Sequence, residues 1–132
     1  MFEKNIPYSR QSINFNDLSS INRVLKSDYL TSGPITKEFE KKIASKVDAK
    51  FAISVNSATS ALHISCMALS IKKNDIVWTS SISFVASANC AKYCGAKVEF
   101  LDIDENSFNI DVKKLEDKLI QSKKKNNLPK LI

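Results

Sequence analysis

The residues best placed to do chemistry are Ser57, Ala58 and Thr59, which stand where a strand is expected to give way to a helix. The β-branched and aromatic run at 51–55 predicts a buried strand, and apolar residues recurring at steps of three and four after Ser57 predict a helix. Ser57 then occupies the N-cap position, and the backbone N–H groups of Ala58 and Thr59 have no helical acceptor. Together with the helix dipole, these donors would bind an anion such as a phosphate. An ordinary serine cap without a ligand is the alternative.

The elements that position this turn follow an alternating order from residue 51 onward. Near-continuous apolar strands that alternate with helices predict an α/β fold, with a parallel sheet covered on both faces. The second and third strands should pair in parallel, and the first should not pair with the second. The expected strands are 51–55, 76–79 and 98–101, the helices begin near Ser57, Phe84 and Asp111, and 128–132 looks like the entry to another strand.

The first fifty residues predict an irregular arm and two helices. Asn16 is the expected cap of the first helix, whose apolar stripe contains Leu18, Ile21 and Leu25. A loop at 29–34 follows, and a spacing of four between apolar residues predicts the second helix around 39–47. We therefore expect two parts, 1–50 with the arm and two helices, and 51–132 with the first half of a larger α/β domain.

Composition excludes several classes of protein. The chain has 132 residues, of which 43% are hydrophobic and 26% charged, as in an ordinary globular domain. No stretch approaches a membrane span and the N-terminus lacks the apolar core of a signal peptide, so a cytoplasmic protein is expected. The net charge of +6 comes from scattered lysines without interleaved aromatic residues, which argues against nucleic-acid binding. With only two glycines, the dinucleotide fingerprint and the P-loop are absent.

The cysteines and the single histidine do not predict a metal or catalytic site. Cys66, Cys90 and Cys94 lie in helical patterns and are expected to be buried, reduced thiols. Cys90 and Cys94 are four residues apart, but no further pair supplies the other ligands of a metal. His63 has no nucleophile at a readable spacing and is expected to be a structural helix residue.

Several separated motifs nevertheless resemble those of one known family. They are the strings at 56–63, 78–90 and 93–98, the opening at 6–11 and the loop at 29–34. Together they resemble the sugar-nucleotide aminotransferases of the DegT/DnrJ/EryC1/StrS type, which use pyridoxal 5'-phosphate (PLP). Within that family they are most similar to the UDP-4-amino-4,6-dideoxy-N-acetyl-β-L-altrosamine transaminases of pseudaminic acid biosynthesis. The resemblance implies an αβα sandwich, the N-terminal part of the large domain of a fold-type I PLP-dependent transferase, with an incomplete sheet.

The resemblance also implies roles for individual residues. Ser57, Ala58 and Thr59 match the turn that holds the PLP phosphate, and Phe84 matches the aromatic residue that stacks on the pyridine ring. Phe84 taken by itself would more simply be a core aromatic. The positions that match contacts to the nucleotide sugar are Tyr8, Asp28, Tyr29, Leu30, Thr31 and again Ala58. The lysine that forms the Schiff base and the aspartate that pairs with the pyridine nitrogen are expected beyond Ile132, so the chain alone is expected to be inactive.

The implied reaction transfers an amino group, with glutamate as the expected donor, to C4 of a UDP-linked 4-keto-6-deoxy sugar. A full-length protein is expected to be a homodimer. A PLP-dependent sugar dehydratase, in which histidine replaces the lysine, is one alternative. A non-catalytic domain that keeps the anion site as a ligand-binding module is another, and a basic nucleic-acid binder is the weakest.

Overall fold

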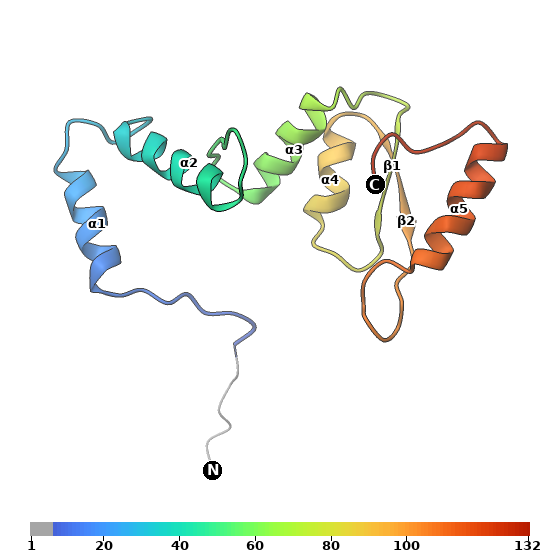
Figure 1. Cartoon of the computed structure of the whole chain (residues 1–132), viewed down its shortest axis with the longest axis horizontal. Coiled ribbons are helices and arrows are strands. Elements are labelled where there is room, and N and C mark those ends of the chain that lie inside the picture. The colour runs from blue at the N-terminus through green and yellow to red at the C-terminus, as the bar shows by residue number, and fades with distance from the viewer. Residues whose placement is uncertain (1–6) are drawn as a thin grey trace, which may run out of the picture. The chain divides into compact units, whose positions relative to one another are not determined.

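The computed structural model describes residues 7–132, which divide into two compact units, one ending at Ser54 and one running from Val55 to Ile132 (Figure 1). The first unit holds helices α1 (Phe15–Leu25) and α2 (Pro34–Lys46). The second holds α3 (Ala58–Ala68), β1 (Ile76–Ser80), α4 (Ala86–Tyr93), β2 (Lys97–Leu101) and α5 (Val112–Lys124). The boundary between Ser54 and Val55 separates two compact units and says nothing of their roles. The predicted division into 1–50 and 51–132 therefore stays a prediction.

Helix α1 begins earlier than the sequence predicts, because Asn14 and not Asn16 is its cap. Asn14 Oδ1 accepts the backbone N–H groups of Asn16 (2.8 Å) and Asp17 (3.3 Å), while Asp17 Oδ2 accepts the N–H of Asn14 (2.8 Å). The reciprocal pairing of Asn14 and Asp17 is a capping box, which satisfies the N–H groups of both residues, and the Asn14 side chain also accepts the N–H of Asn16. The predicted apolar stripe is present on α1, but Leu18 is 59% and Leu25 66% exposed.

The second predicted helix is α2, whose first residue is Pro34. Proline at this position costs nothing, because the first helical N–H lacks an acceptor in any case. The strand predicted at 51–55 is wrong: those residues are assigned to no strand. No other segment of the described chain pairs with them, and the backbone N–H of Ser54 donates instead to Glu40 Oε1 (2.9 Å). An apolar run becomes a strand only when a neighbour accepts its backbone hydrogen bonds.

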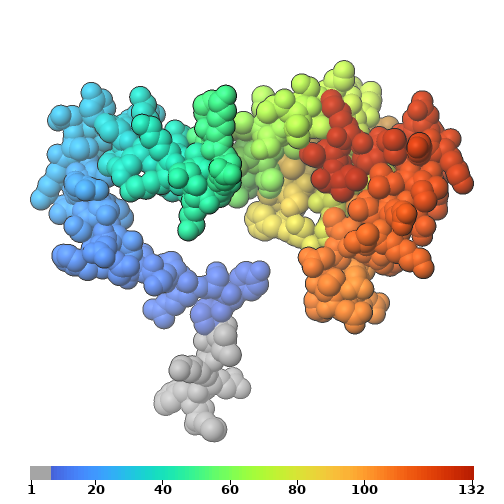
Figure 2. All heavy atoms as spheres, viewed as in Figure 1, coloured from blue at the N-terminus to red at the C-terminus, as the bar shows by residue number. Residues whose placement is uncertain are grey.

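The second unit is built on the parallel pair of β1 and β2, as the sequence predicts. Val77 lies opposite Val98 in this register. On the other edge of β1, Leu131 forms a parallel bridge with Val77, supported by a hydrogen bond from the N–H of Trp78 to the Leu131 carbonyl (3.0 Å). The predicted entry to a further strand at 128–132 is confirmed at Leu131. Figure 2 shows these C-terminal residues in dark red at the surface of the unit, beside α5.

Alternate side chains of β1 point into two separate cores, one on each face of the sheet. Val77 packs with residues of α3 and α4, including Cys66 and Ala91, which is fully buried. Ile76 and Trp78 face the opposite way and pack with Leu101 and with α5. Helices therefore cover both faces, as Figure 1 shows for α4 and α5. This arrangement confirms the predicted α/β class with a parallel sheet between helices.

Candidate functional site

The N-terminus of α3 is built as the sequence predicts, with Ser57 as its N-cap. Ser57 has an extended backbone (φ −159°, ψ 156°), and its Oγ accepts the backbone N–H of Ser60 at 3.2 Å. The N–H of Ala61 donates to the Ser57 carbonyl at 3.1 Å, which closes the first helical turn. Ser60 Oγ donates in turn to Asn56 Oδ1 at 2.7 Å. Side chains on both sides of the turn therefore hold its backbone in one conformation.

This cap leaves two backbone donors without an acceptor. Within the described chain, no group accepts the N–H of Ala58 or of Thr59. Ala58 is exposed and Thr59 half-buried, and the first turn of α3 contains no acidic residue. At α5, by contrast, the carboxylate of Asp111 accepts the N–H of Lys114 (3.0 Å). Two free amides, the helix dipole and the absence of a carboxylate make the start of α3 suited to a phosphate dianion.

The N-terminus of α3 lies toward the carboxyl ends of β1 and β2. In Figure 1, α3, α4 and α5 all begin toward the end of the unit at which β1 and β2 finish. In parallel α/β folds, ligands bind outside the carboxyl ends of the strands, where the helix N-termini gather. The turn that starts α3 and the loop that follows β1 are therefore at the same end of the sheet.

Phe84 lies in this loop, between β1 and α4, which begins at Ala86 and slightly later than predicted. Phe84 is 74% exposed, so the alternative of a core aromatic is wrong for the described chain. The ring lines a cavity of about 210 Å³, together with hydroxyl side chains and a second aromatic ring. The other residues of this cavity include Thr79, Ser80, Ser81, Ser83, Ser87 and Phe100. An exposed flat ring in a cavity at the strand ends is available to stack on a planar ligand.

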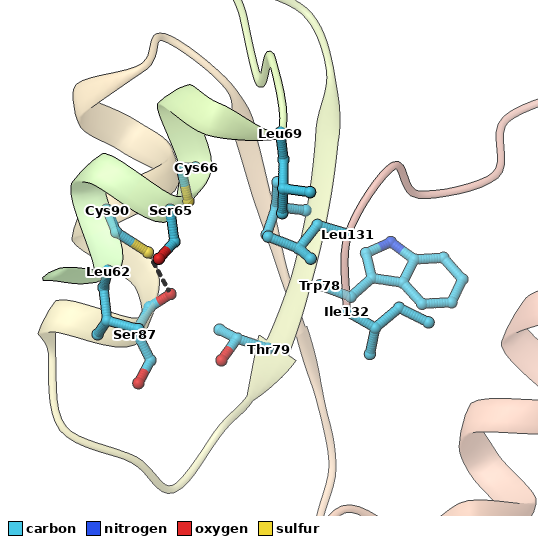
Figure 3. A pocket seen from close by; sticks show the side chains of 11 residues that line it. Leu62, Ser65, Cys66, Leu69, Trp78, Thr79, Ser87, Cys90, Leu131 and Ile132 are labelled. Atoms are coloured by element: carbon cyan, nitrogen blue, oxygen red, sulfur yellow. Dashed lines mark hydrogen bonds between the residues drawn. The ribbon is translucent and has the colours of Figure 1, made fainter. Parts of the chain in front are cut away.

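A larger cavity, of about 310 Å³, lies between α3, α4, β1 and the C-terminal residues (Figure 3). Leu62, Leu69 and Leu131 make its walls apolar, and Cys66 and Cys90 also line it. Burial, and secondarily hydrogen bonding with the Cys90 thiol, raise the pKa of Cys66 to about 11. A protonated thiol is a poor nucleophile, so Cys66 contributes packing surface to this cavity and no reactive thiolate.

The predictions for the cysteines and for His63 are met to different degrees. All three cysteines are free thiols, and Cys66 and Cys90 are buried, but Cys94 is only half-buried because it caps the C-terminus of α4. His63 packs edge-to-face on Tyr93, with ring centroids 5.3 Å apart, as a structural helix residue would. Among residues 7–132 no group of three or more possible ligands is arranged to hold a metal ion. None of the described helices has the length and apolar character needed to cross a membrane.

Apart from Ala58, the residues expected to contact a nucleotide sugar lie in the first unit. Tyr8 is fully exposed in the arm, and 28–31 form the exposed connection after α1. Tyr29 lines a cavity of about 460 Å³ with Ser32, Gly33, Pro34 and Lys37. The other three residues of this segment, Asp28, Leu30 and Thr31, do not line that cavity. Lys37 was not among the predicted site residues, although its position one turn after Pro34, at the start of a helix, can be predicted from the sequence. The substrate role of these residues stays a prediction.

Comparison with known proteins identifies the family. The sequence profile of the DegT/DnrJ/EryC1/StrS aminotransferase family matches residues 11–129. The chain belongs to this family. A UDP-4-amino-4,6-dideoxy-N-acetyl-β-L-altrosamine transaminase of Campylobacter jejuni is 45% identical over 117 residues, which cover 89% of this chain and 31% of that protein. The spore coat polysaccharide biosynthesis protein SpsC of Bacillus subtilis is 41% identical over 84% of this chain and 28% of its own length.

Solved structures of similar proteins share the fold. A sugar aminotransferase of Streptococcus pneumoniae, Spr1654 in its PLP form, superposes with a TM-score of 0.81 at 29% identity, covering 86% of this chain and 29% of that one. The GDP-4-keto-6-deoxy-D-mannose-3-dehydratase of E. coli, with bound hydrated PLP, has a TM-score of 0.79 at 28% identity, covering 86% and 31%. The predicted family is confirmed, and these PLP-bound relatives agree with the predicted cofactor. The chain spans about a third of their length.

Proposed function

We propose that this chain supplies the phosphate-binding and ring-stacking part of a PLP-dependent sugar-nucleotide aminotransferase. One observation carries the proposal: the unpartnered N–H groups of Ala58 and Thr59 at a helix start without acidic residues. Membership of the aminotransferase family gives the anion its identity, because PLP brings a phosphate to such enzymes. The amides and the cap of Ser57 would bind that phosphate, and Phe84 would lie against the ring.

PLP supplies an electron sink that stabilises negative charge next to the amino-bearing carbon of a substrate. Residues 7–132 contribute binding and orientation to that chemistry. The Ala58 and Thr59 amides fix one end of the cofactor without a basic side chain, and Phe84 excludes water from one face of the ring. The lysine that carries out proton transfer is proposed to follow Ile132 in sequence.

The finer assignment rests on the transaminases of C. jejuni, at 45% and 43% identity. We propose a UDP-linked 4-keto-6-deoxy sugar as amino acceptor, and further propose glutamate as donor and a role in making pseudaminic acid or a related surface sugar. Tyr8, the segment 28–31 and Ala58 would contact the nucleotide sugar. A homodimer in the cytoplasm is the proposed assembly and location of the full-length enzyme.

A chimera tests the proposal, with residues 1–132 joined to the part of the C. jejuni transaminase that follows its matching segment. It should bind PLP and aminate a UDP-linked 4-keto-6-deoxy sugar when glutamate is supplied. Phe84→Ala should raise the Kd for PLP, since a lost aromatic stack costs about 1 kcal/mol, or roughly fivefold, before lost buried area is counted. Phe108 is 68% exposed in the turn before α5, so Phe108→Ala is the matched control. A folded chimera that binds no PLP would overturn the proposal.

A sugar dehydratase is the second candidate, because the E. coli dehydratase shares the fold at a TM-score of 0.79. Its 28% identity, against 45% for the transaminase, favours amino transfer. Any coding sequence that continues past the codon for Ile132 distinguishes the two. A lysine at the Schiff-base position supports transfer, and a histidine there supports dehydration.

A further inference from the structure

The ring of Phe84 is held by its backbone rather than by packing. At 74% exposure the side chain has few neighbours that could fix its orientation, unlike Trp78 in the core, which is 1% exposed. The direction of the ring therefore depends on how firmly the chain from 81 to 87 is fixed. The interactions that fix this loop therefore also fix the direction in which the Phe84 ring faces.

Both ends of the loop are anchored. At the β1 end, the N–H of Ser81 donates to the Leu101 carbonyl of β2 at 2.8 Å. At the α4 end, the N–H of Ser87 donates to the Phe84 carbonyl at 2.9 Å, and the Ser87 carbonyl accepts the Cys90 thiol at 3.3 Å. Ser87 itself is half-buried on a helix whose Ala86 and Cys90 are core residues. Ser87 is therefore a fixed point beside Phe84.

One side-chain hydrogen bond connects this fixed point to the exposed part of the loop. Ser83 Oγ and Ser87 Oγ are 2.9 Å apart, and they lie on either side of Phe84 in the sequence. Ser83 is exposed, and within the described chain its hydroxyl has no other hydrogen-bond partner. Val85, the N-cap residue of α4, makes no side-chain cap, and the serine pair is the hydrogen bond between side chains on the two sides of this turn.

We propose that the Ser83–Ser87 hydroxyl pair is a positioning device that fixes Phe84 for ring stacking. This inference rests on the proposed function, since it concerns the same ring. Without the pair, the residues before Phe84 would sample more conformations, and cofactor binding would have to restrict them. One hydrogen bond of this kind corresponds to roughly a fivefold change in an equilibrium constant.

The first test uses the 132-residue chain and needs no cofactor. Hydrogen exchange is followed by mass spectrometry in peptides that cover 82–88 for the parent chain, Ser83→Ala and Ser87→Ala. Both substitutions should increase exchange in these peptides. Ser65→Ala is the matched control, because Ser65 Oγ donates to the Ala61 carbonyl (2.9 Å) on a different helix, and it should leave them unchanged. Equal exchange at 82–88 in all four proteins overturns the proposal.

The second test measures the Kd for PLP in the chimera. Ser83→Ala and Ser87→Ala should each raise it roughly fivefold, and Ser83→Thr, which keeps a hydroxyl, should restore it. In a Phe84→Ala background the serine substitutions should have no further effect, because they act through the ring. Serine effects that persist without Phe84 overturn the positioning role alone. If Phe84→Ala itself leaves the Kd unchanged, the proposed function fails first.

Discussion

Ala58→Pro removes one of the two proposed phosphate donors with little other change. Ala58 is the first residue of α3, the position at which proline is best tolerated. Ser57 before it has an extended backbone, which is the conformation that a residue preceding proline prefers. No group of the described chain accepts the Ala58 N–H, so no internal hydrogen bond is lost. Thr59→Pro is less clean, because the residue before it would be the helical Ala58.

Ala58→Pro should therefore weaken the binding of the PLP phosphate rather than the folding of the helix. A hydrogen bond to a charged group contributes about 1.5–3 kcal/mol, so Ala58→Pro in the chimera should raise the Kd for PLP roughly 10- to 100-fold. Fluorescence titration with PLP measures this change. The Kd for pyridoxal, which lacks the phosphate, should change little.

Val112→Pro provides the matched control. Val112 is the first residue of α5, it follows the extended Asp111, and its side chain is 75% exposed. This variant should fold like Ala58→Pro but bind PLP like the parent chimera. If both proline variants weaken binding equally, or if neither does, the assignment of the phosphate to the start of α3 is refuted.

Three further results are expected of the 132-residue chain itself. Cys66 should resist alkylation by iodoacetamide until the pH approaches its raised pKa of about 11, while the half-buried Cys94 reacts first; equal rates at pH 8 would contradict this. Hydrogen bonding to Lys130 lowers the pKa of Asp75, so their pairing persists at neutral pH and is lost only as the pH falls through that lowered value. Asp75→Asn should therefore loosen the C-terminal segment and speed exchange at the Trp78 amide, whose acceptor is Leu131; unchanged exchange would count against this anchor. The exposed apolar stripe of α1 should cause self-association, and a monomeric mass with a sharp two-state melt would speak against it.

Features set by local sequence were the predictable ones. The Ser57 cap depends on a few neighbouring residues, and its geometry is as predicted. The parallel pairing of β1 and β2 follows from two apolar strands separated by a helix, since a right-handed crossover places them side by side. The capping box of α1 was also readable, because Asn14 stands three residues before Asp17.

Features that depend on distant partners were not predictable in the same way. The run at 51–55 has the composition of a strand, yet strand formation requires a neighbour that the described chain does not provide. The exposure of Phe84 could not be read from its type, because an aromatic residue before a helix fits a core equally well. The hydrogen bond between Ser83 and Ser87 has a visible spacing of four, but it forms only because the loop after β1 brings the two hydroxyls together.

The central claim is that the start of α3 holds the cofactor phosphate, and a crystal structure of the chimera with PLP tests it most directly. The account predicts phosphate oxygens within about 3 Å of the backbone nitrogens of both Ala58 and Thr59, with the pyridine ring against Phe84. A phosphate bound elsewhere, with both amides facing solvent, would contradict it.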